Sequence, residues 1–239
     1  AFDGCGDVPA GELTVQEMTP ESFEGVDIAL FSCGAEVSKQ MRQAVVDAGS
    51  VMIDNSSAFR MDEDVPLVVP EVNPGDLDWH SGVIANPNCS TIQMVVALKP
   101  LYDLARIKRV VVSTYQAASG AGAPAMKELY NQTEEYLGGA DDDHLTVEAF
   151  QHRIAFNCIP HIDVFLENDY TKEEMKMVHE TVKIMRDPNV KVTTASRSPR
   201  PACACPCCAA TASRSTSSSK ATSRPSRRAR RWPPRPASR

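Results

Sequence analysis

The chain has 239 residues, of which 42% are hydrophobic, enough for one sizeable core or two small ones. No apolar run approaches the roughly 18 residues that span a bilayer, and the first residues have no signal-peptide pattern, so we expect neither membrane insertion nor secretion. The formal net charge of −6 hides an uneven distribution, because residues 196–239 hold 11 of the 25 Lys and Arg and none of the 31 Asp and Glu.

Short apolar runs alternate with an amphipathic segment in the first third of the chain. The run at 26–31, bounded by Gly25 and Ser32, is typical of a buried parallel strand. A helix is predicted at 35–49, where apolar residues recur at helical spacing and Gly49 ends the pattern. This series predicts an α/β fold with a mostly parallel sheet. Further strands are predicted at 50–55 and 82–86, and a brief apolar run lies between them at 67–70.

The next segments predict a second, α+β domain that begins near residue 88. Thr171 followed by Glu174 forms a capping box, which predicts the start of a helix over 171–187. The stretch 153–168 is too long and too apolar for a surface loop. Two more helices are predicted at 90–105 and 123–137, and a strand at 108–116.

Residues 196–239 contain almost no aliphatic side chain larger than Ala, so we expect a disordered, low-complexity basic tail. Its cysteine cluster, CACPCC, lacks the ligand spacing of a zinc site. Its Arg-rich end gives only weak reason to expect nucleic-acid binding. Translation out of frame would also produce this composition. At the other end, the start without Met suggests a chain that begins inside a longer protein.

Cys89, in the stretch ANPNCSTIQM, follows a predicted strand and enters a predicted helix. Ligands of α/β sheets bind beyond the carboxyl ends of the strands, and the first amides of a helix stabilise an anion such as a thiolate. The position therefore suits a nucleophile. A small buried hydrophobic residue is an equally good interpretation of a free cysteine.

Six motifs in order resemble those of the aspartate-semialdehyde dehydrogenase family, from about residue 14 to about residue 194. They are DNSSAFRM, VPEVNP, ANPNCSTIQMVVALKPL, STYQAASGAG, IPHIDVF and EEMKMVHETVKIM. The resemblance implies an enzyme of lysine, threonine, methionine and isoleucine biosynthesis, in the cytoplasm or a plastid. The reaction would convert β-aspartyl phosphate and NADPH to aspartate semialdehyde, phosphate and NADP through a cysteine thioester.

The resemblance also implies a domain organisation. Residues 1–87 would form a partial, Rossmann-like dinucleotide-binding domain, and residues 88–195 an incomplete catalytic and dimerisation domain of a homodimer. Cys89 would be the nucleophile, and the other substrate-site residues implied are Gln116, Arg60, Asn88, Glu173 and Lys176. In the family, Gln116 orients the substrate, Arg60 and Lys176 bind phosphate, and Glu173 binds the amine.

Ser119 and Gly120 match residues that approach NADP, and Ser32 falls in a strand-end loop of the cofactor site. No metal is implied. Without the resemblance, Glu173 and Lys176 would be interpreted as a surface pair, and Gln116 as a polar strand end.

Three family features have no counterpart in this sequence: the glycine-rich phosphate loop, the arginine for the substrate carboxylate and the acid/base histidine. Little turnover is therefore expected, because acid/base help is typically worth about 10²–10⁴-fold. Alternatives are N-acetylglutamyl phosphate reductase, glyceraldehyde-3-phosphate dehydrogenase and a non-catalytic fragment that pairs with another subunit.

Overall fold

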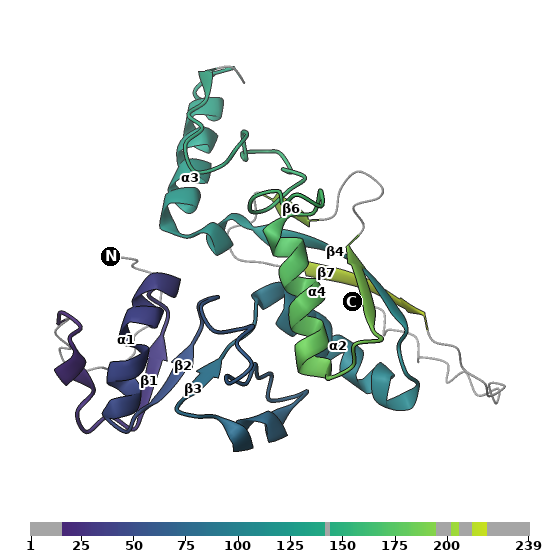
Figure 1. The fold of residues 1–239 in the computed structure, drawn as a ribbon. Coiled ribbons are helices and arrows are strands. Elements are labelled where there is room, and N and C mark those ends of the chain that lie inside the picture. The colour runs from purple at the N-terminus through teal and green to yellow at the C-terminus, as the bar shows by residue number, and fades with distance from the viewer. Residues whose placement is uncertain (1–15, 142–143, 195–201, 206–211, 219–239) are drawn as a thin grey trace, which may run out of the picture. The chain divides into compact units, whose positions relative to one another are not determined.

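The computed structural model describes residues 16–141, 144–194, 202–205 and 212–218 (Figure 1). The chain divides into two compact units, termed unit 1 (Ala1–Pro87) and unit 2 (Asn88–Arg239). Each has its own sheet with helices packed on it, which confirms the α/β class. Among the described residues, no helix has the length and hydropathy needed to cross a membrane.

The sheet of unit 1 is parallel and has the strand order β1-β2-β3, with β1 at Ile28–Phe31, β2 at Val51–Asp54 and β3 at Val83–Ala85. Phe31 pairs with Asp54, and Asp54 pairs with Ala85. All three strands therefore end at the same edge of the sheet.

The brief apolar run at 67–70 forms no strand. Leu67 makes a single bridge to Ala85, in which the Ala85 N–H donates to the carbonyl of Pro66 at 2.9 Å. Pro66 and Pro70 lack the N–H groups that a longer ladder would need, so the pairing stops.

Helix α1 (Ala35–Asp47) packs on β2, and two 3₁₀ helices, η1 (Pro20–Phe23) and η2 (Pro74–Trp79), complete unit 1. Side chains alternate along β1: Ala29 and Phe31 are buried, whereas Ile28 and Leu30 are 59% and 78% exposed. One face of the sheet is therefore covered, and the other is bare at β1.

Unit 2 is built on β4 (Arg109–Ala117), which pairs with β5 (Lys191–Thr194) in parallel. Helices α2 (Cys89–Leu104) and α4 (Lys172–Met185) pack against each other, as Figure 1 shows. Their shared core with the sheet consists of Met94, Leu98, Ile107, Val110, Val112, Met177, Val190 and Val192.

Two further strands of unit 2 lie within 196–239, so the expectation of a disordered tail is wrong for these two parts of it. β6 (Ala202–Cys205) pairs with β4 in parallel, and β7 (Ala212–Ser218) pairs with β4 antiparallel. Backbone pairing needs no large side chains, so the free backbone groups of a long strand such as β4 can pair with segments that have no apolar period. The rest of 196–239, with the side chains of the cysteine cluster, lies outside the described residues.

Helix α3 (Ala123–Leu137) has the bounds that the sequence predicts, and it follows the short helix η3 (Ala118–Ala121). The stretch 153–168 forms neither helix nor strand, and its only paired residues are Ile159 and Phe165, of which Phe165 bridges to Thr171. The expectation that it is no surface loop is therefore wrong in part, because Phe165 is 62% exposed. Its buried side chains join α3 and η3 in a second core of Ala118, Leu129, Ile154, Ala155 and Ile159.

The capping box predicted at α4 is confirmed. The backbone N–H of Thr171 donates to Glu174 Oε2 at 2.7 Å, and the backbone N–H of Glu174 donates to Thr171 Oγ1 at 3.3 Å. This box fixes the first turn of the helix that carries Glu173 and Lys176.

Candidate active site

Cys89 is the first residue of α2 and is exposed. Asn88 is the N-cap of this helix, and its Oδ1 accepts the backbone N–H of Ser90 at 2.9 Å. The thiol therefore lies among the free amides of a helix start and is no part of the core. Cys33 and Cys158 are also free and exposed.

A cavity of about 330 Å³ in unit 2 brings most of the predicted substrate-site residues together. The predicted residues in its lining are Asn88, Cys89, Gln116, Gly120, Glu173 and Lys176. The other lining residues, which the sequence did not single out, are Ala117, Ala121, Phe150, Ile162 and Asp163. The resulting space combines one thiol, three charged groups and an apolar wall.

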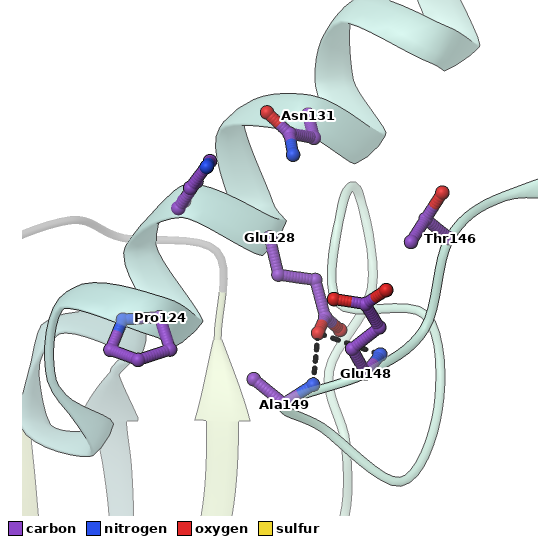
Figure 2. Close-up of a pocket in the computed structure, with 7 residues that line it drawn as sticks. Pro124, Glu128, Asn131, Thr146, Glu148 and Ala149 are labelled. Atoms are coloured by element: carbon purple, nitrogen blue, oxygen red, sulfur yellow. Dashed lines mark hydrogen bonds between the residues drawn. The ribbon is translucent and has the colours of Figure 1, made fainter.

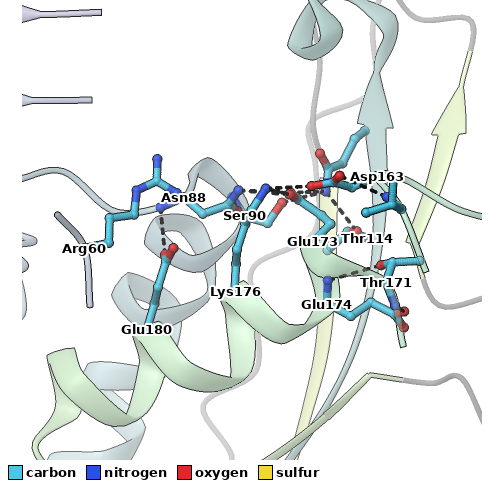
Figure 3. A network of polar contacts seen from close by, with 12 residues as sticks. Arg60, Asn88, Ser90, Thr114, Asp163, Thr171, Glu173, Glu174, Lys176 and Glu180 are labelled. Carbon is cyan, nitrogen blue, oxygen red and sulfur yellow. Dashed lines mark hydrogen bonds and ion pairs between the residues drawn. The ribbon is translucent and has the colours of Figure 1, made fainter. Parts of the chain in front are cut away.

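Glu173 is the centre of the polar network in this cavity (Figure 3). The side-chain amide of Asn88 donates to Glu173 Oε1 at 3.0 Å, and that of Gln116 donates to the same oxygen at 3.1 Å. Gln116 also donates to Ser90 Oγ at 2.8 Å. Because Asn88, Gln116 and Glu173 are all buried, the bonds are shielded from water and fix these side chains around the start of α2.

Lys176 lies between two carboxylates. Its Nζ is 3.1 Å from Glu173 Oε2 and 3.0 Å from Asp163 Oδ2. Burial alone would lower the pKa of Lys176, but the charge of Glu173 and the hydrogen bonds to both carboxylates outweigh it and hold the pKa above its usual value.

Asp163 shows the opposite shift. Burial alone would raise its pKa, but the hydrogen bonds from Lys176 and from the backbone N–H of Val164 hold the pKa below its usual value. Both partners of this ion pair are therefore charged at neutral pH. The sequence signal that could have drawn attention to Asp163 is one acidic residue inside the apolar run IPHIDVF.

Glu180 is a second carboxylate that the sequence did not single out. It is buried on α4, and its Oε2 accepts the backbone N–H of Asn88 at 2.7 Å. This bond ties the N-cap of α2 to α4, so α4 supports the start of the helix that carries Cys89.

Ser119 and Gly120 belong to η3, at the end of β4. Gly120 is exposed and lines the cavity, and a Cβ added to it would meet nothing within 4 Å. Ser119 is half-buried, and its carbonyl accepts the N–H of Gly122 at 3.0 Å. Gly120 therefore faces open space that a bound molecule could occupy.

Arg60 and Ser32 are the predicted residues that belong to unit 1. Arg60 Nε donates to the carbonyl of Asn86 at 2.9 Å, and Nη2 donates to the carbonyl of Asn55 at 3.0 Å. Ser32 Oγ accepts a hydrogen bond from the Asn55 side chain at 3.4 Å. Because Ser32, Asn55 and Asn86 follow β1, β2 and β3, these bonds organise the carboxyl edge of the sheet, where α/β folds bind ligands.

A second cavity of unit 2, of about 320 Å³, lies beside α3 (Figure 2). Glu128 is buried there and accepts the backbone N–H groups of Glu148, Ala149 and Phe150. Since Phe150 also lines the cavity of Cys89, Glu128 supports one wall of the candidate site from behind. In the described part of the chain, no group of three or more His, Cys, Asp or Glu could hold a metal ion.

Comparison with known proteins gives two family matches. Residues 7–80 match the model of the semialdehyde dehydrogenase NAD binding domain, and residues 98–224 match that of the semialdehyde dehydrogenase dimerisation domain. The second match extends into residues 196–239, for which the composition predicts a low-complexity basic tail.

Two curated relatives are aspartate-semialdehyde dehydrogenases. The protein of Aquifex aeolicus is 60% identical over 185 residues, and that of Bacillus subtilis is 56% identical over 185 residues. Each alignment covers 76% of this chain and 54% of the relative. The chain therefore spans about half the length of these relatives.

A solved structure of aspartate semialdehyde dehydrogenase II from Vibrio cholerae is similar, with 48% identity and a TM-score of 0.76. The match covers 82% of this chain and 56% of that one. A second structure of the same protein, in complex with ASA, matches with 47% identity and a TM-score of 0.76.

Proposed function

Because this chain belongs to the semialdehyde dehydrogenase family, we propose that it serves the NADPH-dependent reductive dephosphorylation of β-aspartyl phosphate to aspartate semialdehyde. The observation that carries the proposal is the placement of Cys89. An exposed thiol at a helix start shares a small cavity with Glu173, Lys176 and Gln116. These are the groups that capture of an amino-acyl phosphate requires.

In the proposed reaction, the thiolate of Cys89 attacks the acyl carbon, and the bond from that carbon to the phosphate oxygen breaks. Phosphate leaves with the electron pair, and a thioester remains on Cys89. Hydride reduces the thioester, the C–S bond breaks, and the aldehyde leaves while the thiolate is restored. NADPH, when bound, supplies the hydride. Asn88 and Gln116 orient the acyl group beside the start of α2.

The charges of the cavity favour a substrate with a free amine. Glu173 would accept the substrate ammonium, and Lys176 would contact the phosphate as a point charge. Arg60, in unit 1, is the second proposed phosphate ligand. An N-acylated substrate has no ammonium to place against the carboxylate of Glu173, so this residue disfavours the N-acetylglutamyl phosphate alternative.

For the cofactor, we propose NADP, with Ser32 at the carboxyl edge of the unit 1 sheet and Ser119 and Gly120 beside Cys89 as its contacts. The match to an NAD binding domain and the open space above Gly120 support a nucleotide here. We also propose a homodimer formed through unit 2. The match to a dimerisation domain supports it, as do the exposed side chains of Tyr130 and Leu137 on α3.

The sharpest test is the rate of thiol alkylation, because it requires neither hydride transfer nor turnover. We expect iodoacetamide to modify Cys89 faster than Cys33 or Cys158, as measured by mass spectrometry of peptides at timed intervals. All three thiols are exposed, so Cys33 and Cys158 control for access of the reagent. Because Cys33 also precedes a helix, it controls for the effect of a helix start on thiol reactivity. Inorganic phosphate should slow the reaction of Cys89 alone.

The substitution Cys89→Ser should remove the fast phase and abolish any reduction of NADP by aspartate semialdehyde and phosphate. Equal rates at the three cysteines, with no effect of phosphate, would contradict the proposal.

A further inference from the structure

Asp163 has no role in the proposed chemistry, yet it contacts the group proposed to bind phosphate. Its Oδ2 is 3.0 Å from Lys176 Nζ, and it lines the same cavity as Cys89. The side chains of Asp163 and Lys176 are 28% and 22% exposed, so the pair is partly shielded from water but still open to an incoming solute.

The backbone at Asp163 presents this carboxylate to the cavity in a fixed way. The residue has a φ of 67°, in the left-handed region that few residues other than glycine adopt. Asp163 Oδ1 accepts the backbone N–H of Val164 at 2.9 Å, and the Val164 carbonyl accepts the backbone N–H of Lys172 at 2.9 Å. The turn is thus fixed from its own side chain and from the start of α4.

The two carboxylates that flank Lys176 differ in what else holds them. Glu173 also accepts the amides of Asn88 and Gln116, so it stays in place when Lys176 moves. Asp163 contributes one oxygen to Lys176 and the other to its own turn. A phosphate that approaches Lys176 can therefore displace the carboxylate of Asp163 at a lower cost in free energy than it would need to displace that of Glu173.

We propose that Asp163 is a positioning residue that holds the ammonium of Lys176 in the cavity until the phosphate of the substrate takes the place of its carboxylate. This inference rests on the proposed function. It implies that the charge of Asp163 opposes phosphate binding, so this residue sets how tightly the site holds the phosphate of its substrate and of its product.

The test compares Asp163→Asn with the unaltered full chain in the alkylation assay, with phosphate titrated at constant ionic strength. Asn adopts left-handed backbone and keeps an oxygen for the Val164 N–H, so the turn is retained. Glu173 still holds Lys176 in place. Loss of one neighbouring charge at a partly exposed site should lower the phosphate concentration that half-protects Cys89 by about 3–10-fold.

Asp169→Asn is the matched control, because Asp169 is an exposed residue of the same segment with a similar φ of 64° and does not line the cavity. It should leave phosphate protection unchanged. Asp163→Glu restores the charge and should return the half-protecting concentration toward that of the unaltered chain. A purely structural role predicts the reverse of our expectation, with weaker protection in Asp163→Asn.

The outcomes separate this inference from the proposed function. Suppose that phosphate protects Cys89 in the unaltered chain, but that the Asp163→Asn variant needs the same or a higher phosphate concentration for half-protection. That result would overturn the role of Asp163 and leave the proposed function standing. If phosphate does not protect Cys89 in the unaltered chain, the role of Asp163 is overturned. The proposed function is overturned as well if Cys89 also reacts no faster than Cys33 and Cys158.

Discussion

Asn88 has two tasks at the start of α2. Its Oδ1 caps the helix through the N–H of Ser90, and its amide holds Glu173. One residue therefore links the position of the nucleophile to the carboxylate proposed for the substrate amine.

These two tasks can be separated by substitution. Asn88→Ala should lower the free energy of unfolding by about 0.5–2 kcal/mol, because it removes the cap and leaves the buried Glu173 with one donor fewer. Asn88→Ser keeps a capping oxygen and should lose less. Chemical denaturation measures both, and equal stability of the two variants would show that the cap contributes nothing.

Residues of the site differ in how far the sequence could predict them. Asn88 and Cys89 are adjacent, and Glu173 and Lys176 lie one helical turn apart, so local patterns and motif resemblance suffice to find them. Asp163 meets Lys176 only because a left-handed turn brings residue 163 back to the start of α4. Because no glycine stands at this position, the sequence does not indicate a left-handed turn here.

At the scale of elements, α3 and the segment 144–155 are held together by two side chains on one helix face. Glu128 accepts three consecutive backbone N–H groups, and Gln132 Oε1 accepts those of Ile154 and Ala155 at 2.9 and 3.0 Å. The five amides donate to side chains and not to the backbone carbonyls of a helix or strand. These bonds therefore satisfy backbone N–H groups that regular structure would otherwise pair.

Glu128→Gln should therefore loosen this segment. The amide has one acceptor oxygen in place of two and no charge, so we expect a loss of about 1–3 kcal/mol in stability. Amide hydrogen exchange at Glu148, Ala149 and Phe150 should quicken. Glu134→Gln, on the exposed face of α3, is the control and should change neither quantity. Unchanged exchange at these three amides in Glu128→Gln would refute the support that we assign to Glu128.

The elements themselves were predicted to different degrees. Helices with caps and apolar periods were found within one or two residues, and α3 agrees at both ends. The segments 67–70 and 153–168 are apolar runs that contain proline and form no strand, because apolar character indicates burial and not backbone pairing. β6 and β7 are the reverse case, since backbone pairing with β4 forms strands that have no apolar pattern.

For the molecule as a whole, the exposed apolar side chains of β1 in unit 1 bear on how the chain behaves in solution. Parallel sheets are normally covered on both faces. Ile28 and Leu30 are instead exposed on β1, the strand at the edge of the sheet. The chain therefore presents an apolar strand to solvent despite its net charge of −6.

The double substitution Ile28→Thr and Leu30→Thr should reduce this surface and keep β propensity. We expect less binding of the dye ANS and less light scattering at equal protein concentration. The matched control replaces buried residues of the same strand, Ala29→Ser and Phe31→Leu, and should not lower dye binding. Unchanged scattering after the threonine substitutions would show that this face is already covered in solution.

The polar network around Glu173 has a consequence for anyone who wishes to redesign the pocket. Three donors, from Asn88, Gln116 and Lys176, converge on one shielded carboxylate. Removing that carboxylate to admit a neutral compound would leave the buried Asn88 amide without this acceptor, and would leave Gln116 with Ser90 and Lys176 with Asp163 alone. New selectivity at this place therefore demands that the four side chains be exchanged as a set, and libraries that vary them one at a time will miss it.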